Sequence, residues 1–348
     1  MSALTPEALL ADYLALADDS CVAVLPHVLR ITAELGIADV LAADTMTVED
    51  IATATDADTE ALYRLLRALV SVGVLLEDPA RSFRLTETGH RLRADAPDSV
   101  RESVLNADSQ RAWLHGIDTI RSGRSVFDSV HGGDFFGHKN SDGAADRAFL
   151  RRMRERTGRL YGQFSATPDW RQSDVVMDIG GGDGFMLERI LREADHVKGI
   201  LFDRPSVIDV VGNAEHIRSL GERCRLEKGD FFESLPSGAD THTLCSVLHD
   251  WTDSQVITIL RNSRKALRDG GRLLIVEMLV PENHEWHPSR WSDIGMMVLT
   301  GGRERTAKEF TTLLDESGFT LSGVTPIPNS YFSVLEAKQD HGDVGSRG

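Results

Sequence analysis

Cysteine is scarce in this sequence, and long apolar runs are absent from it. The three cysteines, Cys21, Cys224 and Cys245, lie far apart, match no metal-binding spacing and cannot all pair within one chain. No window approaches the roughly eighteen uninterrupted apolar residues of a membrane span, and the N-terminus lacks a basic region followed by an apolar core. We therefore expect neither a disulfide scaffold nor a membrane protein, and we expect a reducing, cytoplasmic location.

Basic residues are few relative to acidic ones. The chain has 38 Lys and Arg against 54 Asp and Glu, a formal net charge of −16. Such a charge repels phosphate backbones and anionic lipid, so we expect neither nucleic acid nor a membrane as a partner. At 348 residues the chain exceeds a comfortable single core, which predicts two domains with a helical connector.

The first predicted domain, residues 1–99, has the pattern of a winged helix. Thr47 and Asp50 resemble a capping box that opens a short helix, and Asp58 precedes a longer amphipathic helix. Two β-prone runs around an Asp-Pro turn follow, as in a hairpin or wing.

A winged helix also raises DNA binding as an alternative. The candidate recognition helix offers only Arg64 and Arg67 as cations, and the rest of its surface is largely apolar. That surface is better suited to packing on a partner subunit than to a DNA groove.

Residues 100–165 are helical in character and are expected to form a connector and substrate lid. They contain a dense basic run, RRMRER at 151–156, which we expect to be a solvated helix face.

Strand and helix patterns alternate from Val175 onward, which predicts an α/β domain over residues 166–338. Such alternation is typical of a parallel sheet covered by helices on both faces. The tail, residues 339–348, has no apolar anchor and is expected to be disordered.

The most informative segment is VVMDIGGGDG, which starts at Val175. It predicts a strand that ends near Asp178, a turn through Gly180, Gly182 and Gly184, and a helix whose N-terminus faces a ligand. A dinucleotide fingerprint would need glycine at the position of Phe185. The DxGxGxG spacing instead favours S-adenosylmethionine.

Two further acids follow the next two predicted strands. Asp203 lies where α/β nucleotide folds place a carboxylate on the ribose, and Asp230 could accept the adenine amino group while Phe231 packs on the ring. Each acid alone is often only a turn residue. Because all the acids follow consecutive strands, they are expected at the ligand-binding edge of the sheet.

The fourth strand of this domain leads into His249, Asp250 and Trp251 at the same edge. A neutral imidazole titrating near pH 6.5 is a natural general base for an acceptor that must lose a proton. Glu277 or Glu304 could hold its other nitrogen, although both acids could equally lie on the surface. No metal is implied, because HEWH at 284–287 fails the HExxH spacing.

Six features follow one another along the chain in the order DIGGGDG, Asp203, GDFF, LHDW, GGRLLIVE and GGRERT. In these features the chain resembles the S-adenosylmethionine-dependent O-methyltransferases. That family includes plant caffeate and hydroxyindole types and bacterial antibiotic-biosynthesis enzymes. The resemblance runs from about Leu25 to Lys338. It implies a Rossmann-like domain with a mostly parallel seven-stranded sheet, an N-terminal winged-helix domain that forms a homodimer, and S-adenosylmethionine as cofactor with S-adenosylhomocysteine as product.

The resemblance also implies roles for single residues. His249 would be the base, Glu277 and Glu304 would orient it, and Asp250 lies beside it. Many members carry Lys where this chain has Cys245. The candidate cofactor-binding residues are Asp178, Gly180, Gly182, Asp203, Arg204, Asp230, Phe231, Cys245 and Ser246.

The expected reaction is methyl transfer to a hydroxyl, expected to be phenolic, of a small aromatic natural product. Candidate substrate contacts are apolar side chains for which packing is the alternative role: Trp113, Phe127, Met153, Phe164, Met296 and Met297. Two other functions stay open: non-methylating chemistry such as decarboxylation, hydroxylation or a pericyclic step, and a DNA-binding regulator that senses S-adenosylmethionine.

Overall fold

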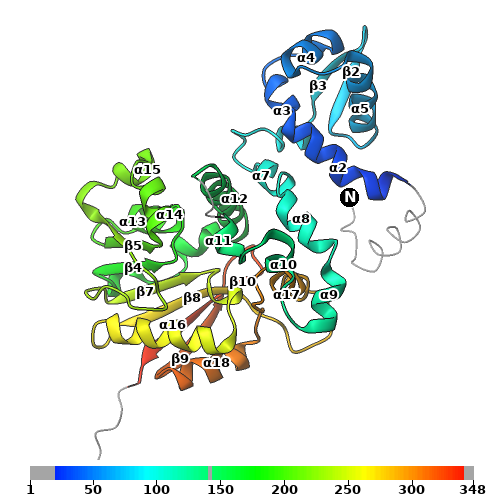
Figure 1. Cartoon of the computed structure of the whole chain (residues 1–348). Coiled ribbons are helices and arrows are strands. Elements are labelled where there is room, and N and C mark those ends of the chain that lie inside the picture. The colour runs from blue at the N-terminus through cyan, green and yellow to red at the C-terminus, as the bar shows by residue number, and fades with distance from the viewer. Residues whose placement is uncertain (1–19, 140–142, 341–348) are drawn as a thin grey trace, which may run out of the picture. The chain divides into compact units, whose positions relative to one another are not determined.

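The computed structural model describes residues 20–139 and 143–340, and the chain divides into two compact units, Met1–Ala107 and Asp108–Gly348 (Figure 1). The side chain of Cys21, the N-terminal segment and the tail from residue 341 lie outside the described part. Within the described ranges, none of the helices combines the length and apolar character that a bilayer crossing needs.

The N-terminal unit is built from short helices and a small sheet. The helices are α2 (Ser20–Glu34), α3 (Ile37–Val40), α4 (Val48–Thr55), α5 (Thr59–Ser71), α6 (Glu87–His90) and α7 (Arg101–Val104), and the strands are β1 (Met46–Thr47), β2 (Leu75–Asp78) and β3 (Ser82–Leu85).

This unit has the winged-helix arrangement that the sequence predicts. Thr47 caps α4 through the N–H of Asp50, and Asp58 caps α5 through the N–H of Ala61. The β2–β3 hairpin is antiparallel, and β1 pairs with β3 to complete a sheet of order β1-β3-β2. The apolar stripe of α5, Leu62, Leu66 and Leu69, is buried in this unit's own core.

Helices lead from α8 to the sheet of the second unit. They are α8 (Ala107–Trp113), α9 (Gly116–Ser122), α10 (Phe127–His131), α11 (Phe135–Lys139) and α12 (Gly143–Tyr161), followed by the 3₁₀ turns η1 (Gly162–Ala166) and η2 (Trp170–Gln172). Phe127 and Phe135 pack with Val298 in a separate small core.

A seven-stranded sheet forms the centre of the second unit. Its strands are β4 (Val175–Ile179), β5 (Lys198–Asp203), β6 (Cys224–Lys228), β7 (Thr241–Cys245), β8 (Arg272–Met278), β9 (Phe319–Pro326) and β10 (Phe332–Gln339), in the order β6-β5-β4-β7-β8-β10-β9. The first five in this order are parallel, and β10 runs antiparallel to both its neighbours. The predicted mostly parallel sheet is confirmed. Gln339, expected in the tail, is the last residue of β10.

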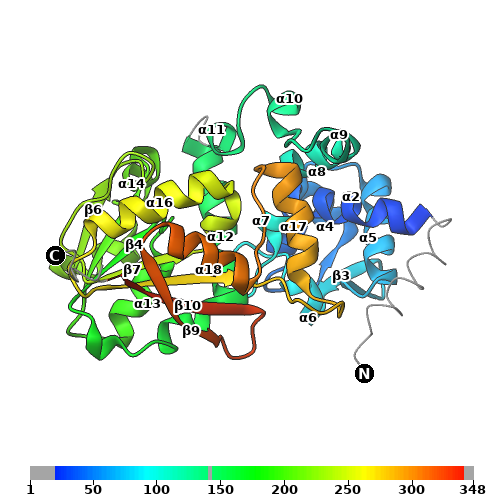
Figure 2. The same cartoon turned by 90° about the horizontal axis from the view of Figure 1, so that it is seen from below.

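Helices cover both faces of this sheet (Figures 1 and 2). Helices α13 (Phe185–Glu193) and α14 (Pro205–Val211) pack in one core, and α16 (Asp253–Ala266) and α18 (Ala307–Glu316) pack in the other. The remaining elements are α15 (Glu215–Arg218), α17 (Pro288–Leu299), η3 (Gly221–Arg223) and η4 (Leu248–Asp250).

The parallel register brings the ends of the central strands to one edge. Ile179 pairs with Phe202, and Cys245 pairs with Val276. The segments that follow β4, β5 and β7, together with the end of β8, therefore lie at the carboxyl edge of the sheet, where open α/β sheets bind ligands.

Candidate active site

The glycine turn after β4 has the expected backbone conformation. Gly180, Gly182 and Gly184 have φ angles of 69°, 58° and 76°, in the left-handed region that glycine adopts without steric cost. Helix α13 begins immediately after Gly184. A Cβ at Gly184 would lie 2.5 Å from the end of the Ile217 side chain, which would have to move.

Asp203, the last residue of β5, is bound to this turn. Its Oδ2 accepts the N–H of Gly182 at 2.8 Å, and its Oδ1 accepts the N–H of Arg204 at 2.7 Å. Burial raises the pKa of Asp203, although these two backbone donors and the Arg204 guanidinium oppose the rise. The predicted ribose carboxylate is thus held by backbone amides at the edge of the turn.

Asp178 lies buried at the end of β4. Thr243 donates to its Oδ1 at 2.7 Å, whereas its buried Oδ2 has no hydrogen-bond partner among the described residues. Burial raises the pKa of Asp178 to about 7, and the charges of Asp203 and Asp183 add to this effect.

Asp230 and Phe231 follow β6 as expected. Asp230 Oδ1 accepts the N–H of Phe232 and so caps its own turn. The Phe231 ring is close to the glycine turn, because a Cβ at Gly180 would lie 3.7 Å from it. It also meets the edge of Trp251, with ring centroids 5.8 Å apart.

Three polar residues complete the candidate cofactor set. The buried Oγ of Ser246 lies next to the Tyr161 hydroxyl, and Ser246 has a φ of 54°. Burial raises the pKa of the Cys245 thiol far above its usual range, and the charges of Asp178 and Glu277 add to this rise. The Arg204 guanidinium lies over the ring of Phe136, 5.3 Å from its centroid.

These residues fit a cationic ligand such as S-adenosylmethionine, which carries a sulfonium and an ammonium group. Asp178 and Asp203 place two carboxyl groups at the glycine turn, and the unpartnered Oδ2 of Asp178 leaves hydrogen-bonding capacity for a ligand.

The predicted catalytic group is assembled from three segments. His249 lies in η4, with Nδ1 2.9 Å from Glu277 Oε2 and 3.5 Å from Glu304 Oε1. Its Nε2 is 3.9 Å from Asp250 Oδ2, which is beyond hydrogen-bond distance. Glu277 and Glu304, which could have been surface acids, are 0% and 2% exposed.

Glu277 also holds the backbone of η4, the turn that carries His249. Its Oε1 accepts the N–H groups of Val247, Leu248 and His249 at 3.1, 2.9 and 3.3 Å. Oε1 is thus taken up by the backbone, and Oε2 is the oxygen that faces the imidazole Nδ1.

The charge state of His249 differs from the sequence expectation. Burial lowers the pKa of an imidazole, but here Glu277, Glu304 and Asp250 outweigh it and raise the pKa of His249 to about 10. Conversely, burial raises the pKa of Asp250 to about 6 against the opposing charge of His249. The expectation of an imidazole titrating near pH 6.5 is therefore wrong, because three acids converge on one ring.

The loop after α17 packs against the turn that carries His249. Its key residue, Arg305, was not among the residues predicted from the sequence. Arg305 is 1% exposed and donates to the carbonyl groups of Leu248 and Trp251 at 2.9 and 2.7 Å. Gly302 packs so closely that a Cβ there would lie 2.1 Å from the His249 carbonyl oxygen. The GGRERT motif contained both residues.

The basic run in α12 is not the solvated face expected from the sequence. Arg154 donates to Asp183 in the glycine turn at 2.9 Å and to Glu188 at 3.3 Å. Its guanidinium lies over the Phe185 ring, 4.7 Å from the centroid. Arg154 therefore anchors α12 to the glycine turn.

The candidate substrate residues are not all near His249. Phe164 is fully buried against Trp170, which lies by Arg272 at the opposite end of β8 from Glu277. Phe127 is fully buried against His131, and Trp113 is 46% exposed. Met153, Met296 and Met297 are half-buried, and their contact with substrate stays a prediction.

Comparisons with known proteins agree with this geometry. The chain matches the O-methyltransferase domain model over residues 113–320 and the O-methyltransferase dimerisation domain model over residues 20–95. A phenazine O-methyltransferase from Lysobacter antibioticus is 37% identical over 312 residues, which cover 89% of this chain and 91% of that protein. The aclacinomycin 10-hydroxylase of Streptomyces purpurascens is 34% identical over 334 residues, covering 90% and 87%.

A solved structure extends the comparison to ligands. An O-methyltransferase from neocarzinostatin biosynthesis, crystallised with S-adenosylmethionine and 2-hydroxy-5-methyl naphthoic acid, has a TM-score of 0.79 and 29% identity. The match covers 90% of this chain and 96% of that one. The chain therefore belongs to the S-adenosylmethionine-dependent O-methyltransferases and carries the dimerisation domain of that family ahead of its catalytic domain.

Proposed function

We propose that this enzyme methylates a phenolic hydroxyl of a small aromatic natural product, with His249 as the general base. The observation that carries the proposal is the pairing of His249 Nδ1 with Glu277 at 2.9 Å and Glu304 at 3.5 Å. Because both carboxylates lie at Nδ1, the ring is oriented with Nε2 as the nitrogen available to an acceptor.

The residues of the chain supply binding, orientation and proton transfer. Asp203, the glycine turn, Asp230 and Phe231 would hold the nucleoside, and Asp178 and Ser246 would hold the polar end of the cofactor. When bound, S-adenosylmethionine supplies an electrophilic methyl group. In the neutral form of His249, Nε2 takes the acceptor proton, and the acceptor oxygen keeps the electron pair of its O–H bond. With that pair the oxygen would form its bond to the methyl group while the methyl–sulfur bond breaks and its electrons stay on sulfur. Glu277 and Glu304 stabilise the resulting imidazolium.

The aromatic acceptor is supported by the relatives and by the surroundings of the site. The phenazine and naphthoate named above are flat and aromatic. In this chain Trp251 stacks on Phe136, with centroids 5.2 Å apart and planes 21° apart. Met153, Met296 and Met297 would add flexible apolar contacts.

Non-methylating chemistry is the second candidate, because the aclacinomycin 10-hydroxylase is a relative. His249 and both of its carboxylates are present here, which favours methyl transfer.

One experiment separates the two chemistries. The purified enzyme is incubated with methyl-labelled S-adenosylmethionine and a panel of hydroxylated phenazines, naphthoates and benzoates, and both S-adenosylhomocysteine and labelled product are measured. Our proposal predicts equal amounts of the two. Conversion of an acceptor without S-adenosylhomocysteine release would refute it.

We also propose that the enzyme is a homodimer. The dimerisation-domain match supports this, and α2 exposes Val24, Leu25 and Ile31 at 47%, 37% and 38%. Exposed apolar side chains on one helix are typical of an interface. Light scattering of the eluted protein should give twice the 38.3 kDa chain mass, and a monomer mass would contradict it. Location in a reducing cytoplasm stays a prediction from the scattered cysteines.

A further inference from the structure

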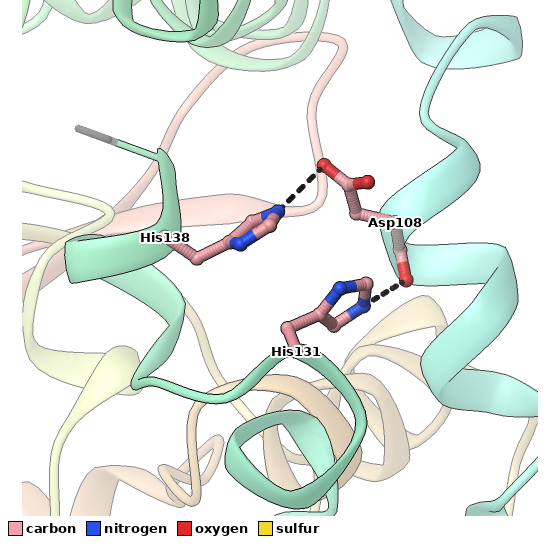
Figure 3. A group of neighbouring side chains, drawn as sticks. All are labelled: Asp108, His131 and His138. Carbon is pink, nitrogen blue, oxygen red and sulfur yellow. Dashed lines mark hydrogen bonds and ion pairs between the residues drawn. The ribbon is translucent and has the colours of Figure 1, made fainter. Parts of the chain in front are cut away.

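We propose that Asp108, His131 and His138 form a binding site for a divalent cation of the zinc type, distinct from the methyl-transfer site. The three side chains come from α8, α10 and α11 and face one another (Figure 3). One ligand atom from each lies within 4.8 Å of the others. Two imidazoles and a carboxylate are a donor set that suits Zn²⁺, with a fourth position left for water.

The local backbone brings the two histidines together. His131 is the last residue of α10, and Gly132, with a φ of 77°, ends that helix. Asp134 then caps the start of α11 through the N–H of Gly137 at 2.9 Å. The result is a tight connection that leaves the two rings 4.6 Å apart, between centroids.

The contacts already present orient the donors. His131 Nε2 is 3.1 Å from the Asp108 carbonyl oxygen. If Nε2–H donates there, Nδ1 carries the lone pair for a metal, and a histidine whose second nitrogen donates to a carbonyl is the usual arrangement in metal sites. His138 Nε2 is 3.3 Å from Asp108 Oδ2. Ligands of a tetrahedral zinc lie about 3.4 Å apart, so only small side-chain movements are needed.

One cation already competes for the carboxylate. Lys139 Nζ donates to Asp108 Oδ2 at 2.7 Å. The charge of this ammonium opposes a second cation at the same carboxylate, and a variant without it should therefore bind zinc more tightly.

The proposed metal site shares helix α11 with a residue that contacts the methyl-transfer site. Helix α11 also carries Phe136, whose ring stacks on Trp251 next to Asp250. The Phe136 carbonyl group accepts a hydrogen bond from the Arg204 guanidinium at 3.5 Å. A metal that ties α8 to α11 would hold this aromatic contact at the edge of the cofactor site.

The test is zinc binding to metal-stripped, full-length enzyme, measured by calorimetry with ZnCl₂ and by the visible absorption of Co²⁺. We expect one equivalent per chain in the wild type and at least about tenfold weaker binding in His131→Ala and His138→Ala. Lys139→Met should bind more tightly than the wild type. His115→Ala, which removes an exposed histidine, should bind unchanged.

A separate control is needed for the methyl-transfer site, because His249, Glu277 and Glu304 also lie close enough to one another to hold a metal. His249→Ala should retain the zinc equivalent. Loss of binding in His249→Ala, with retention in His131→Ala and His138→Ala, would overturn the proposal. So would a wild type that binds no more tightly than His138→Ala. If either alanine variant fails to fold by circular dichroism, the direction of change in Lys139→Met decides.

Discussion

The pH dependence of the reaction should be set by the acids around His249, and Glu304→Gln tests this most sharply. Ser292 donates a hydrogen bond to Glu304 Oε1 at 2.7 Å. Glutamine keeps the shape of the side chain, and its amide oxygen can still accept this hydrogen bond. It removes a carboxylate 3.5 Å from His249 Nδ1. The substitution therefore changes the charge with little change in packing.

The size of the effect follows from the pKa of His249. The rise from 6.5 to about 10 corresponds to about 5 kcal/mol in favour of the imidazolium. Glu277, Glu304 and Asp250 together raise this pKa against the opposing effect of burial. Removing the charge of Glu304 should therefore lower the pKa of His249 by about one pH unit. A raised pKa keeps the ring protonated at neutral pH, and the base form appears only as the pH increases. At any pH below this pKa, the neutral fraction of His249 should therefore be larger in Glu304→Gln than in the wild type.

The assay is kcat/KM against pH from 6 to 10.5 for the wild type and Glu304→Gln, with the same acceptor so that its own ionisation cancels in the comparison. We expect the rising limb of the variant to lie about one unit lower. Glu316→Gln, on the exposed surface of α18, should match the wild type. A Glu304→Gln limb that coincides with the wild type, or lies above it, would refute the reasoning.

Other expected outcomes rest on separate contacts. Asp203→Asn should weaken S-adenosylmethionine binding by about 1.5–3 kcal/mol by calorimetry, as for a lost charged hydrogen bond, and equal affinity would remove the ribose role. Gly302→Ala should lower both the melting temperature and turnover, because its Cβ would lie 2.1 Å from the His249 carbonyl oxygen; an unchanged melting temperature would show that the loop relaxes freely. Arg154→Met should weaken cofactor binding through the loss of its contacts to Asp183 and Glu188, whereas Arg171→Met, at an exposed arginine, should not; an equal effect of both would contradict the anchoring role.

The fold and much of the site could be predicted because their signals are local. Glycines at alternate positions after an apolar strand require a left-handed turn, and acids that follow parallel strands meet at one edge wherever the sheet forms. The cap residues Thr47 and Asp58 likewise act within one helical turn.

The remaining features depend on contacts between distant segments. The partner of Arg154 lies 29 residues away, so nothing in RRMRER separates an anchoring arginine from a solvated one. The pKa of His249 depends on carboxyl groups from β8, η4 and the loop before α18, and their convergence is a tertiary property. Phe164 is apolar and helical in the same way as Met153, and only packing assigns it to the core beside Trp170.

Single-turnover methyl transfer by His249→Ala tests the central claim most directly. The enzyme, saturated with labelled S-adenosylmethionine, is mixed with an acceptor found by the panel and quenched at timed intervals, beside the wild type and His196→Ala, an exposed histidine. We predict unchanged cofactor affinity and a rate of transfer about 10²–10⁴-fold lower in His249→Ala only. A His249→Ala rate equal to that of the wild type would contradict the assignment of the base.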